Sequence, residues 1–428
     1  DDGVIFVSID DNENEKLKKC CDEVFGSQNF IAQLVWERAY APVNLKKHFS
    51  ENHDYIICYA KDIDKAICNG LPRASEANDR YSNPDNDPRG IWKSDNLSVG
   101  PIVQSKIYEI ITPGGRKVLP PEGYCWRLSK EKFKEFVKDN RIWFGKDGNN
   151  VPSIKRFLTE VKQSITPMTI WKYSEVGHSQ DAKQNLKKLF DGKSFFDYPK
   201  SVELIKRCIQ LYSNESSIII DFFSGSATTA HAVMQLNAED GGKRKFIMVQ
   251  LPEKTDEKSE AFKAGYENIC EIGKERIRRA GEKIKEEAGL NGQDLDIGFR
   301  VLKLDSSNMK DIYYSADEYD QGMLENMQSN TKEDRTDLDL LFGCLVDWGL
   351  ELDKPYTTKV INKVHIYNDG DLVACFEKDL DMKTIDEIAK LQALRVVFCD
   401  NSFIDSATKI NVAEHFKMIA PDTDIRVI

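Results

Sequence analysis

Apolar and polar residues alternate in blocks that predict strands separated by helices. Residues 4–10 form an apolar run of strand length, and a charged stretch with helical spacing follows over residues 12–24. Further strands are expected at residues 30–36 and 55–60. This pattern is typical of an α/β sheet.

The alternation stops between residues 61 and 103, where Asn, Asp, Pro and Gly predominate and a domain boundary is expected. Beyond it, two apolar runs flank the turn Thr112-Pro113-Gly114-Gly115 and predict a β-hairpin. A helix at residues 130–137 and a strand at 141–144 should follow. Pro152 stands where a proline commonly opens another helix.

The third part of the chain predicts a compact βαβ unit. A helix is expected at residues 197–212, followed by a strand at 217–221, a helix at 227–236 and a strand at 245–251. The charged stretch that follows should be mostly helical, and the tail should form a separate small α/β domain. A helix is therefore expected over residues 253–287. Strands are expected at residues 296–303 and, in the tail, at 360–367, 372–376 and 394–399.

Charge is unevenly distributed around a net value of −11. Residues 100–210 contain 21 Lys and Arg against 12 Asp and Glu, whereas residues 301–428 contain 14 against 25. The middle of the chain is therefore suited to phosphate contacts and the tail is not.

The ten cysteines predict neither a metal site nor disulfides. Cys20 and Cys21 are adjacent and the others are scattered, without a C-x-x-C pair or a zinc-type Cys/His spacing. Free thiols in a reducing cytoplasm are expected. No run of about 18 uncharged apolar residues occurs, so no membrane span is expected.

The segment from Ile218 to His231 is the most informative in the chain. A buried strand should end at Asp221 and turn through small residues into a helix, with Gly225 permitting close backbone approach to a ligand. The helix N-terminus offers unpaired N–H donors, and the Asp221 carboxylate could receive an ammonium group. The glycine patterns of P-loops, of serine hydrolases and of dinucleotide-binding folds are absent.

The run Asp-Phe-Phe-Ser-Gly-Ser-Ala-Thr-Thr at 221–229 resembles the F-x-G-x-G motif of S-adenosylmethionine-dependent DNA amino-methyltransferases. Residues 195–205 resemble motif X of that family, and residues 245–253 resemble its second strand, whose polar end faces the cofactor ribose. Motif X before motif I, with the recognition region earlier still, is the permuted β-class order.

Further segments resemble the modification (Mod) subunits of type III restriction-modification systems, which are β-class DNA adenine-N6 methyltransferases. They are residues 3–13, 120–127, 141–145, 177–182, 298–301 and 303–308. The resemblance implies a Rossmann-like, circularly permuted and incomplete methyltransferase sheet with an inserted recognition domain. The expected organisation is a first core part at 1–62, a DNA-binding target-recognition domain at 63–190, a cofactor-binding core part at 191–300, and a C-terminal α/β assembly or dimerisation domain at 301–428.

The resemblance also implies which residues bind S-adenosylmethionine. They are Phe196, Pro199, Lys200, Asp221, Phe223, Ser224, Gly225, Ser226, Thr228, and Gln250 or Glu253 for the ribose hydroxyls. Two simpler interpretations stay open, because Phe223 could be a core aromatic and Lys200 a solvated charge. Ala227 stands where the family often has a second glycine, and its methyl is tolerable if its φ is negative.

No D-P-P-Y-type catalytic tetrapeptide occurs in the chain. In the family its acid and a backbone carbonyl accept hydrogen bonds from the adenine amino group, and its aromatic stacks on a flipped-out base. In the permuted order it belongs upstream of Gly3, and the opening Asp1-Asp2-Gly3 reads like a cut inside a longer, N-terminally truncated protein. We therefore expect no catalytic residue here and no methylation by this chain alone.

The basic middle region is the expected DNA-binding surface. The residues expected to contact DNA are Arg116, Lys117, Arg127, Arg141, Lys146, Lys155, Arg156 and Lys172, although any single one could be a solvated surface charge. The family implies double-stranded DNA, a homodimer and a restriction helicase-nuclease subunit as partners. Two alternatives remain at this point: a non-catalytic DNA-binding or assembly module, and an unrelated Rossmann-like oxidoreductase.

Overall fold

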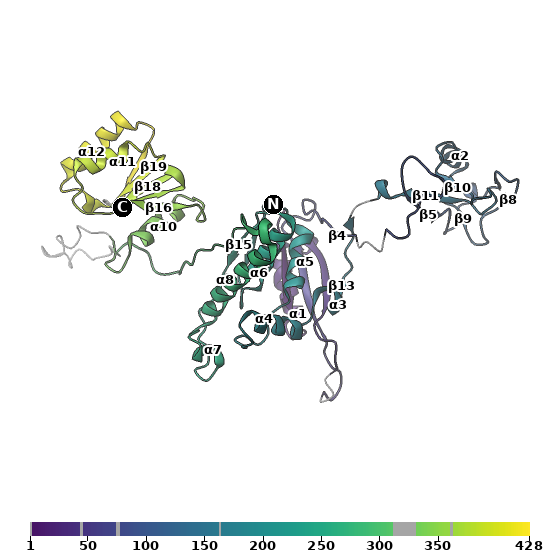
Figure 1. Cartoon of the computed structure of the whole chain (residues 1–428), viewed down its shortest axis with the longest axis horizontal. Coiled ribbons are helices and arrows are strands. Elements are labelled where there is room, and N and C mark those ends of the chain that lie inside the picture. The colour runs from purple at the N-terminus through teal and green to yellow at the C-terminus, as the bar shows by residue number, and fades with distance from the viewer. Residues whose placement is uncertain (1, 43–45, 74–77, 162–163, 311–330, 360–362) are drawn as a thin grey trace. The chain divides into compact units, whose positions relative to one another are not determined.

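The computed structural model describes residues 2–42, 46–73, 78–161, 164–310, 331–359 and 363–428 (Figure 1). The chain divides into two compact units, Asp1–Ile297 and Gly298–Ile428. Each unit has hydrophobic cores of its own.

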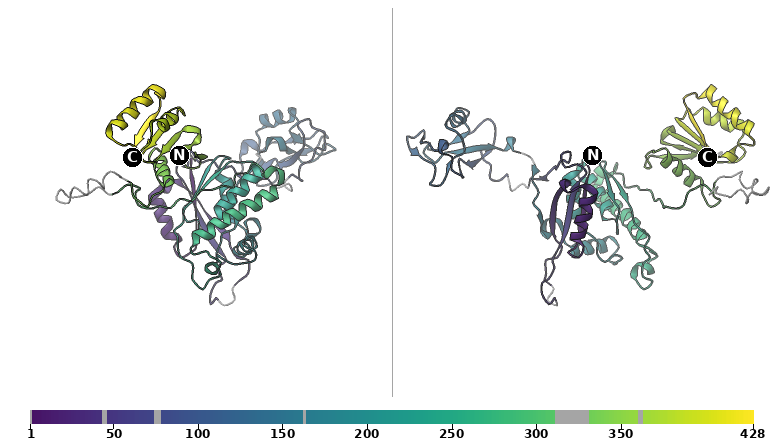
Figure 2. Two further views of the ribbon diagram at one scale, coloured as in Figure 1. Left: turned by 60° about the vertical axis from the view of Figure 1, so that its left-hand side comes forward. Right: turned by 180° about the vertical axis from the view of Figure 1, so that it is seen from behind.

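A four-stranded sheet opens the first unit, with strand order β1-β3-β2-β13. Strands β1, β3 and β2 pair antiparallel, and β13 joins β2 in parallel. Helix α1 covers one face through Cys21, and α3 and α5 cover the other through Val176 and Leu204 (Figures 1 and 2). The bounds are β1 Val4–Ile9, α1 Asn14–Phe25, β2 Phe30–Glu37, β3 His53–Ala60, β13 Ile170–Trp171, α3 Tyr173–Val176 and α5 Val202–Tyr212.

A separate parallel pair, β14 (Ile218–Asp221) and β15 (Lys245–Met248), carries the βαβ unit predicted from the sequence. Helix α6 (Thr228–Asp240) connects the two strands and packs with α5 on their inner face around Ile219 and Phe246. Because α5 also contributes Leu204 to the core of the four-stranded sheet, one helix covers both sheets. The predicted α/β class is confirmed, with the strands of these layers divided between two sheets.

An inserted lobe leaves and rejoins the first unit through the antiparallel pair β4 (Leu71–Pro72) and β12 (Ser164–Ile165). Its centre is a sheet of order β10-β11-β5, with two small strand pairs and helix α2 around the buried Trp126 and Phe133. The bounds are β5 Trp92–Asn96, β6 Ser98–Val99, β7 Ile110–Ile111, β8 Lys117–Val118, β9 Cys125–Trp126, α2 Lys130–Lys138, β10 Ile142–Trp143 and β11 Ser153–Phe157.

After the lobe, the chain returns to the core earlier than the expected boundary at residue 190. Helix α4 (Ser179–Leu189) places Leu186 in a cluster with Ala261 and Ile272. Those two residues belong to α7 (Glu260–Lys263) and α8 (Ile269–Ala288). Residues 170–190 therefore pack with the sheet layers, and the lobe is shorter than the expected segment 63–190.

The second unit has a five-stranded sheet of order β16-β17-β18-β19-β20, antiparallel in its first three strands and parallel in its last three. Helices α11 and α12 cover one face around Ile385 and Phe416, and α10 covers the other around Leu341. The bounds are α10 Asp337–Asp347, β16 Tyr356–Lys359, β17 Val364–Tyr367, β18 Leu372–Cys375, α11 Met382–Ala389, β19 Arg395–Phe398, α12 Ser406–Ile419 and β20 Asp424–Val427.

Several predicted elements are wrong or too long. Pro152 precedes strand β11 instead of a helix, because Ser153–Phe157 pairs with β5 and β10 on either side. Residues 197–201 are not helical, since the residue before Pro199 disfavours the α conformation. The long helix expected at 253–287 is broken between α7 and α8, where Gly265 has a φ of +92°.

The strand expected at 296–303 is absent, and these residues form no ladder. The strand expected at 360–367 is confirmed from Val364 onward, while residues 360–362 lie outside the described residues. Among the helices described, none combines the length and the apolar character that a bilayer crossing requires.

Candidate cofactor and DNA-binding sites

The turn between β14 and α6 is built around the side chain of Asp221. Its Oδ1 accepts from the Phe223 N–H at 3.1 Å, and its Oδ2 accepts from the Thr229 hydroxyl at 2.6 Å. Oδ1 therefore orders the turn just after the strand, and Oδ2 ties the end of the strand to the first turn of α6. The first N–H groups of that helix turn have no intrahelical acceptor.

Gly225 has a φ of +50°, a conformation that favours glycine. Its N–H donates to Gln250 Oε1 at 2.7 Å, which links the turn to the end of β15. A Cβ at position 225 would lie 3.4 Å from Phe196 Cζ, so the motif X segment packs directly over this glycine. The two predicted motifs, far apart in sequence, thus meet at Gly225.

The flanking residues predicted from motif X have different surroundings. Pro199 is buried. Lys200 forms an ion pair with Asp54 at 3.1 Å and lies over the Trp36 ring. The Lys200 ammonium is therefore bound to Asp54 in the first unit, although its side chain is still 37% exposed.

The residues predicted within the turn also differ from one another. Phe223 is 81% exposed, so the interpretation of this residue as a core aromatic is wrong. Ser224 is buried, and the hydroxyls of Ser226 and Thr228 accept from Arg276. Ser226 and Thr228 are buried and bind Arg276, so their side chains support the turn.

Ala227 does not have the negative φ under which its methyl group would be tolerable. Its φ is +58° and its ψ is +41°, in the left-handed region, not at a negative φ. An alanine there is disfavoured by contact between its Cβ and the following carbonyl. The position therefore has the backbone of the glycine that the family often carries.

Of the two candidates for the ribose, Gln250 is already engaged. Its Oε1 accepts from Gly225 and its Nε2 donates to the Leu251 carbonyl at 3.2 Å. Glu253 is exposed a few residues further along. This geometry favours Glu253 as the acceptor for ribose hydroxyls. Gln250 instead stabilises the turn through its hydrogen bond with Gly225.

Arg276 on α8 was missed by the sequence reasoning. It lies beneath the turn and is 3% exposed. Ile272, Ile277 and Ala280 on the same helix are also buried. The position of Arg276 on this apolar face could therefore have predicted that it is buried. A cation at such a position requires a polar partner, which here is the turn itself.

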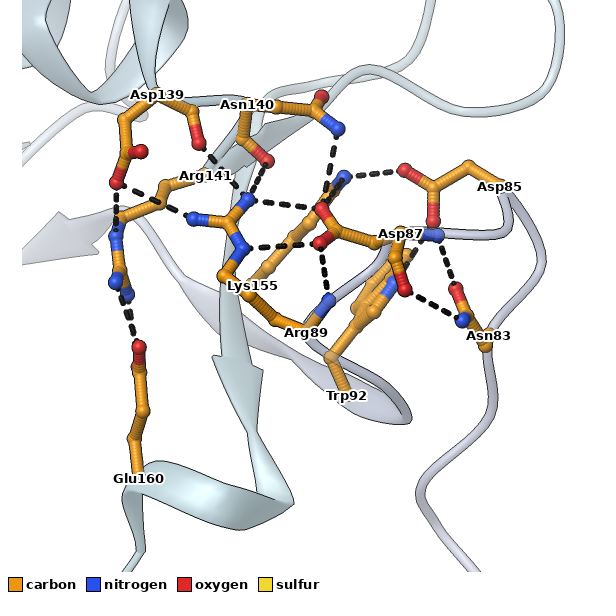
Figure 3. Close-up of polar contacts among 10 residues, drawn as sticks. All are labelled: Asn83, Asp85, Asp87, Arg89, Trp92, Asp139, Asn140, Arg141, Lys155 and Glu160. Carbon is orange, nitrogen blue, oxygen red and sulfur yellow. Dashed lines mark hydrogen bonds and ion pairs between the residues drawn. The ribbon is translucent and has the colours of Figure 1, made fainter.

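Lys155 does not fit the predicted DNA contact. Its side chain is fully buried, and its ammonium binds Asp85 and Asp87, the latter at 3.2 Å (Figure 3). Arg89 also pairs with Asp87 at 2.8 Å, and the hydrogen bond from Arg89 holds the pKa of Asp87 well below its usual range. Lys155 therefore neutralises carboxylates inside the lobe and is not available to a phosphate.

Three more predicted DNA contacts are engaged within the lobe. Arg141 donates to both carboxylate oxygens of Glu160, at 2.8 and 2.6 Å, and also pairs with Asp139 (Figure 3). These bonds raise the pKa of the guanidinium. Arg127 and Arg156 share the carboxylate of Asp95, at 2.8 and 2.9 Å.

Two loops of the lobe bring the remaining predicted cations together. The hairpin turn at 112–116 bonds to the turn at 145–150 through Gly114 N–H to the Gly148 carbonyl, 3.1 Å, and Arg116 Nη1 to the Asn149 carbonyl, 3.3 Å. Exposed Arg116 and Lys146 belong to these turns, and exposed Lys117 begins β8 directly after the first of them; we name these three residues the basic turn patch. Lys117 also pairs with Glu109 at 3.2 Å.

Lys172 is exposed at the start of α3, outside the lobe. All ten cysteines are free thiols. Over the described residues, no three His, Cys, Asp or Glu side chains gather as a metal site would require.

Comparison with known proteins gives the family. The model of the N6/N4 DNA methylases matches residues 1–282. The chain belongs to the DNA methylase family. The match covers the lobe and the whole β14–α6–β15 unit and ends before the second unit.

Curated relatives of this DNA methylase include type III modification subunits. It is 34% identical over 303 residues to the StyLTI Mod subunit of Salmonella typhimurium, covering 70% of this chain and 45% of that one. It is 30% identical to the EcoP15I Mod subunit of Escherichia coli, covering 71% and 50%, and 29% identical to the type II methyltransferase M.KpnI of Klebsiella pneumoniae, covering 65% and 69%. The chain spans about half the length of the Mod subunits it matches.

Proposed function

We propose that this methylase chain is the cofactor-binding and DNA-recognising part of a site-specific DNA adenine-N6 methyltransferase. It would serve as the modification subunit of a type III restriction-modification system in the cytoplasm. The observation that carries the proposal is the turn after β14, where Phe196 packs on Gly225 and Gln250 accepts from its N–H.

S-adenosylmethionine would supply the methyl group at this turn. The open backbone at Gly225, the exposed ring of Phe223 and the first N–H groups of α6 suit an adenosyl amino acid. Asp221 orders the turn and presents a carboxylate toward an ammonium group, and Glu253 would accept from the ribose.

Calorimetric titration with S-adenosylmethionine tests this assignment, with NAD as the control nucleotide. Binding of the first and not of the second supports the proposal. Gly225→Val should abolish binding, because its side chain requires a negative φ and would meet Phe196. Binding of NAD alone would contradict the assignment.

The chain carries no D-P-P-Y-type tetrapeptide, so we propose that it does not methylate DNA by itself. The proposal draws support from the outer face of β14, where Ile218 and Ile220 are each 60% exposed. Incubation with labelled cofactor and unmethylated DNA is the test. Methyl transfer above background would refute the proposal.

A second candidate is a DNA-binding or assembly module without chemistry of its own. The pairing of β14 with β15 alone, among the described residues, favours it, because ligand sites of open α/β sheets lie at a switch point between neighbouring strands of one sheet. Gel shifts with and without cofactor separate the two candidates. DNA binding that is indifferent to S-adenosylmethionine supports the module, whereas binding strengthened by it supports the methyltransferase part.

DNA recognition is assigned to the basic turn patch of the lobe. Among the described residues, exposed Arg116 and Lys146 form no ion pair with a carboxylate, and exposed Lys117 pairs only with Glu109 at the surface. Lys155, by contrast, is fully buried with Asp85 and Asp87. Phosphate contacts by such residues make affinity fall steeply with salt. Lys172 would extend these contacts at the edge of the core.

The salt dependence of DNA affinity tests this patch. Lys146→Glu or Arg116→Glu should lower the slope of log affinity against log salt by about 1 for each phosphate that the variant no longer binds. Lys132→Glu on α2 is the matched control, and its slope should not change. Equal slopes for all variants would contradict the assignment.

We propose the remaining roles by domain. Residues 1–62 and 191–300, together with residues 170–190 that pack with them, would form the methyltransferase core, the lobe within residues 63–169 would bind DNA, and residues 301–428 would serve assembly. A homodimer and a restriction helicase-nuclease subunit are the expected partners. Sedimentation of the chain alone and with the restriction subunit tests both.

A further inference from the structure

Arg276 lies under the turn that follows β14. Its Nη1 donates to Ser226 Oγ at 2.8 Å, to Thr228 Oγ1 at 2.7 Å and to the Ser226 carbonyl at 3.3 Å. These acceptors flank Ala227, the residue with the disfavoured positive φ. One side chain therefore binds both sides of the most strained point of the turn.

Helix α8 approaches this turn closely, and α8 packs beside α6 (Figure 1). One helical turn before Arg276, a Cβ built on Gly273 would lie 3.5 Å from the Gly225 carbonyl oxygen and 3.6 Å from Ala227 Cβ. The absence of a side chain at residue 273 lets the helix backbone come near the turn. Arg276 is thus held at short range from Gly225 and Ala227.

The charge of Arg276 has no carboxylate partner in the described part of the chain. Its hydrogen bonds go to neutral oxygens, and its buried Nε has no acceptor among the same residues. Burial lowers the pKa of Arg276 to about 9, so the group stays charged at neutral pH at a cost in free energy. By contrast, Arg279 on the same helix pairs with Glu275 and Asp191.

An uncompensated buried cation contributes little to folding stability, because its desolvation opposes its hydrogen bonds. Such a charge is better explained by an anion that arrives with a ligand. S-adenosylmethionine, the proposed ligand, carries one carboxylate, on its methionine part. In a region of low dielectric, attraction between the two charges is only weakly screened.

We infer that Arg276 is a positioning residue that fixes the turn at 223–228 and whose buried positive charge favours ligands with a carboxylate. The inference rests on the proposed function, because it places the amino acid part of an S-adenosyl ligand at this turn. Helix α8 would thus contribute to the selection of the ligand through Arg276.

Two ligands that share the adenosyl thioether test this inference. S-adenosylhomocysteine carries the carboxylate, and 5′-methylthioadenosine lacks it. Their affinities are measured by calorimetry for the unchanged chain, Arg276→Met, Arg276→Lys and the control Arg278→Met. Arg278 lies on the same helix with its side chain 56% exposed.

Arg276→Met should weaken S-adenosylhomocysteine by about tenfold or more, because it removes a buried positive charge near the ligand carboxylate, and should change 5′-methylthioadenosine much less. Arg276→Lys should restore most of the preference, and Arg278→Met should behave like the unchanged chain. The melting temperature of Arg276→Met should stay near that of the unchanged chain. If this variant does not fold, Arg276→Gln, which keeps donors without charge, provides the same comparison.

Equal losses of affinity for both ligands would overturn the inference, since they would show that Arg276 only supports the fold. Unchanged binding of both ligands would overturn it as well. Failure of the unchanged chain to bind either ligand would instead refute the proposed function, and the inference with it. The two failures are therefore distinguishable.

Discussion

At the residue scale, the backbone of Ala227 is the clearest departure from low-energy geometry near the site. Its φ of +58° costs about 1–2 kcal/mol for a residue with a Cβ. Arg276 binds the residues on either side, and the Ala227 side chain is buried. The turn therefore keeps a conformation that its sequence does not favour.

Ala227→Gly should stabilise the first unit by about 1 kcal/mol, because glycine adopts this conformation without the steric cost. The midpoint of urea unfolding measures the change. Ala230→Gly, inside α6, is the matched control and should destabilise by about 1 kcal/mol or more. A lower midpoint for Ala227→Gly would show that packing of the methyl group outweighs the strain.

His231 should make stability sensitive to acid. Burial, reinforced by the charge of Arg276, lowers the pKa of His231 to about 3. An unfolded histidine titrates near pH 6.5 (about its free value), so the unfolded chain takes up the proton first. The stability due to neutral His231 is thus complete above about pH 6.5 and is lost as the pH falls toward 3.

His231→Gln should therefore flatten the decline of the unfolding free energy between about pH 6.5 and about pH 4. Urea unfolding of both proteins across this range is the measurement. A decline of equal steepness in the variant would contradict a buried neutral imidazole.

Sequence reasoning at this scale identified residue types better than their partners. The turn at 221–229 could be recognised because a small-residue turn after an apolar strand is typical of nucleotide-binding folds and its sequence resembles the family motif. Lys155 and Arg141 could not be judged, since their carboxylate partners are 68 and 19 residues away in sequence at Asp87 and Glu160. The sequence shows which residues are charged, but which of them form ion pairs depends on the fold.

At the scale of elements, the lobe is organised around a buried ion cluster instead of a purely apolar core. Lys155 on β11 binds Asp85 and Asp87 from the loop before β5, and Arg89 binds Asp87 and Asp139 (Figure 3). The cluster joins the loop to the sheet and to the end of α2. Its carboxylates depend on their cations for stability in the interior.

Lys155→Met should destabilise the lobe by about 3 kcal/mol, because it leaves buried carboxylates short of a counter-charge. Faster hydrogen exchange over β5, β10 and β11, with unchanged exchange over β1–β3, is the expected signature. Lys132→Met, exposed on α2, is the control. Recovery of protection in a double variant with Asp85→Asn would support the electrostatic cause, and unchanged exchange in Lys155→Met would contradict it.

Elements were predicted well where periodicity was strong. Helix α2 and the pair β14 and β15 agree with the pattern of apolar residues. Strand β11 was mistaken for a helix, because Ser153–Phe157 is short and its Lys155 is buried by ion pairing that no apolar pattern reveals.

At the scale of the whole molecule, the division at residue 297 has a thermodynamic consequence. The family match ends at residue 282, and the second unit has its own cores on both faces of its sheet. The sequence indicated this unit through its acidic charge and its return to strand and helix alternation. Units with separate cores unfold separately.

Calorimetry should therefore show two thermal transitions. A fragment of residues 298–428 should fold alone and reproduce one of them, with the other shifted by ligand binding to the first unit. A single cooperative transition for the chain, or an unfolded fragment, would contradict independence of the two units.

The antiparallel pair β4 and β12 fixes the two ends of the lobe next to one another, and Asn69 anchors the entry point to the carbonyls of Gln210 and Ser213 at the end of α5. The geometry of the insertion site is thus set without help from the inserted residues. Loop closure costs little more for longer inserts once the ends are fixed. Replacing the residues between β4 and β12 by another insert should accordingly leave the turn after β14 and its contacts intact.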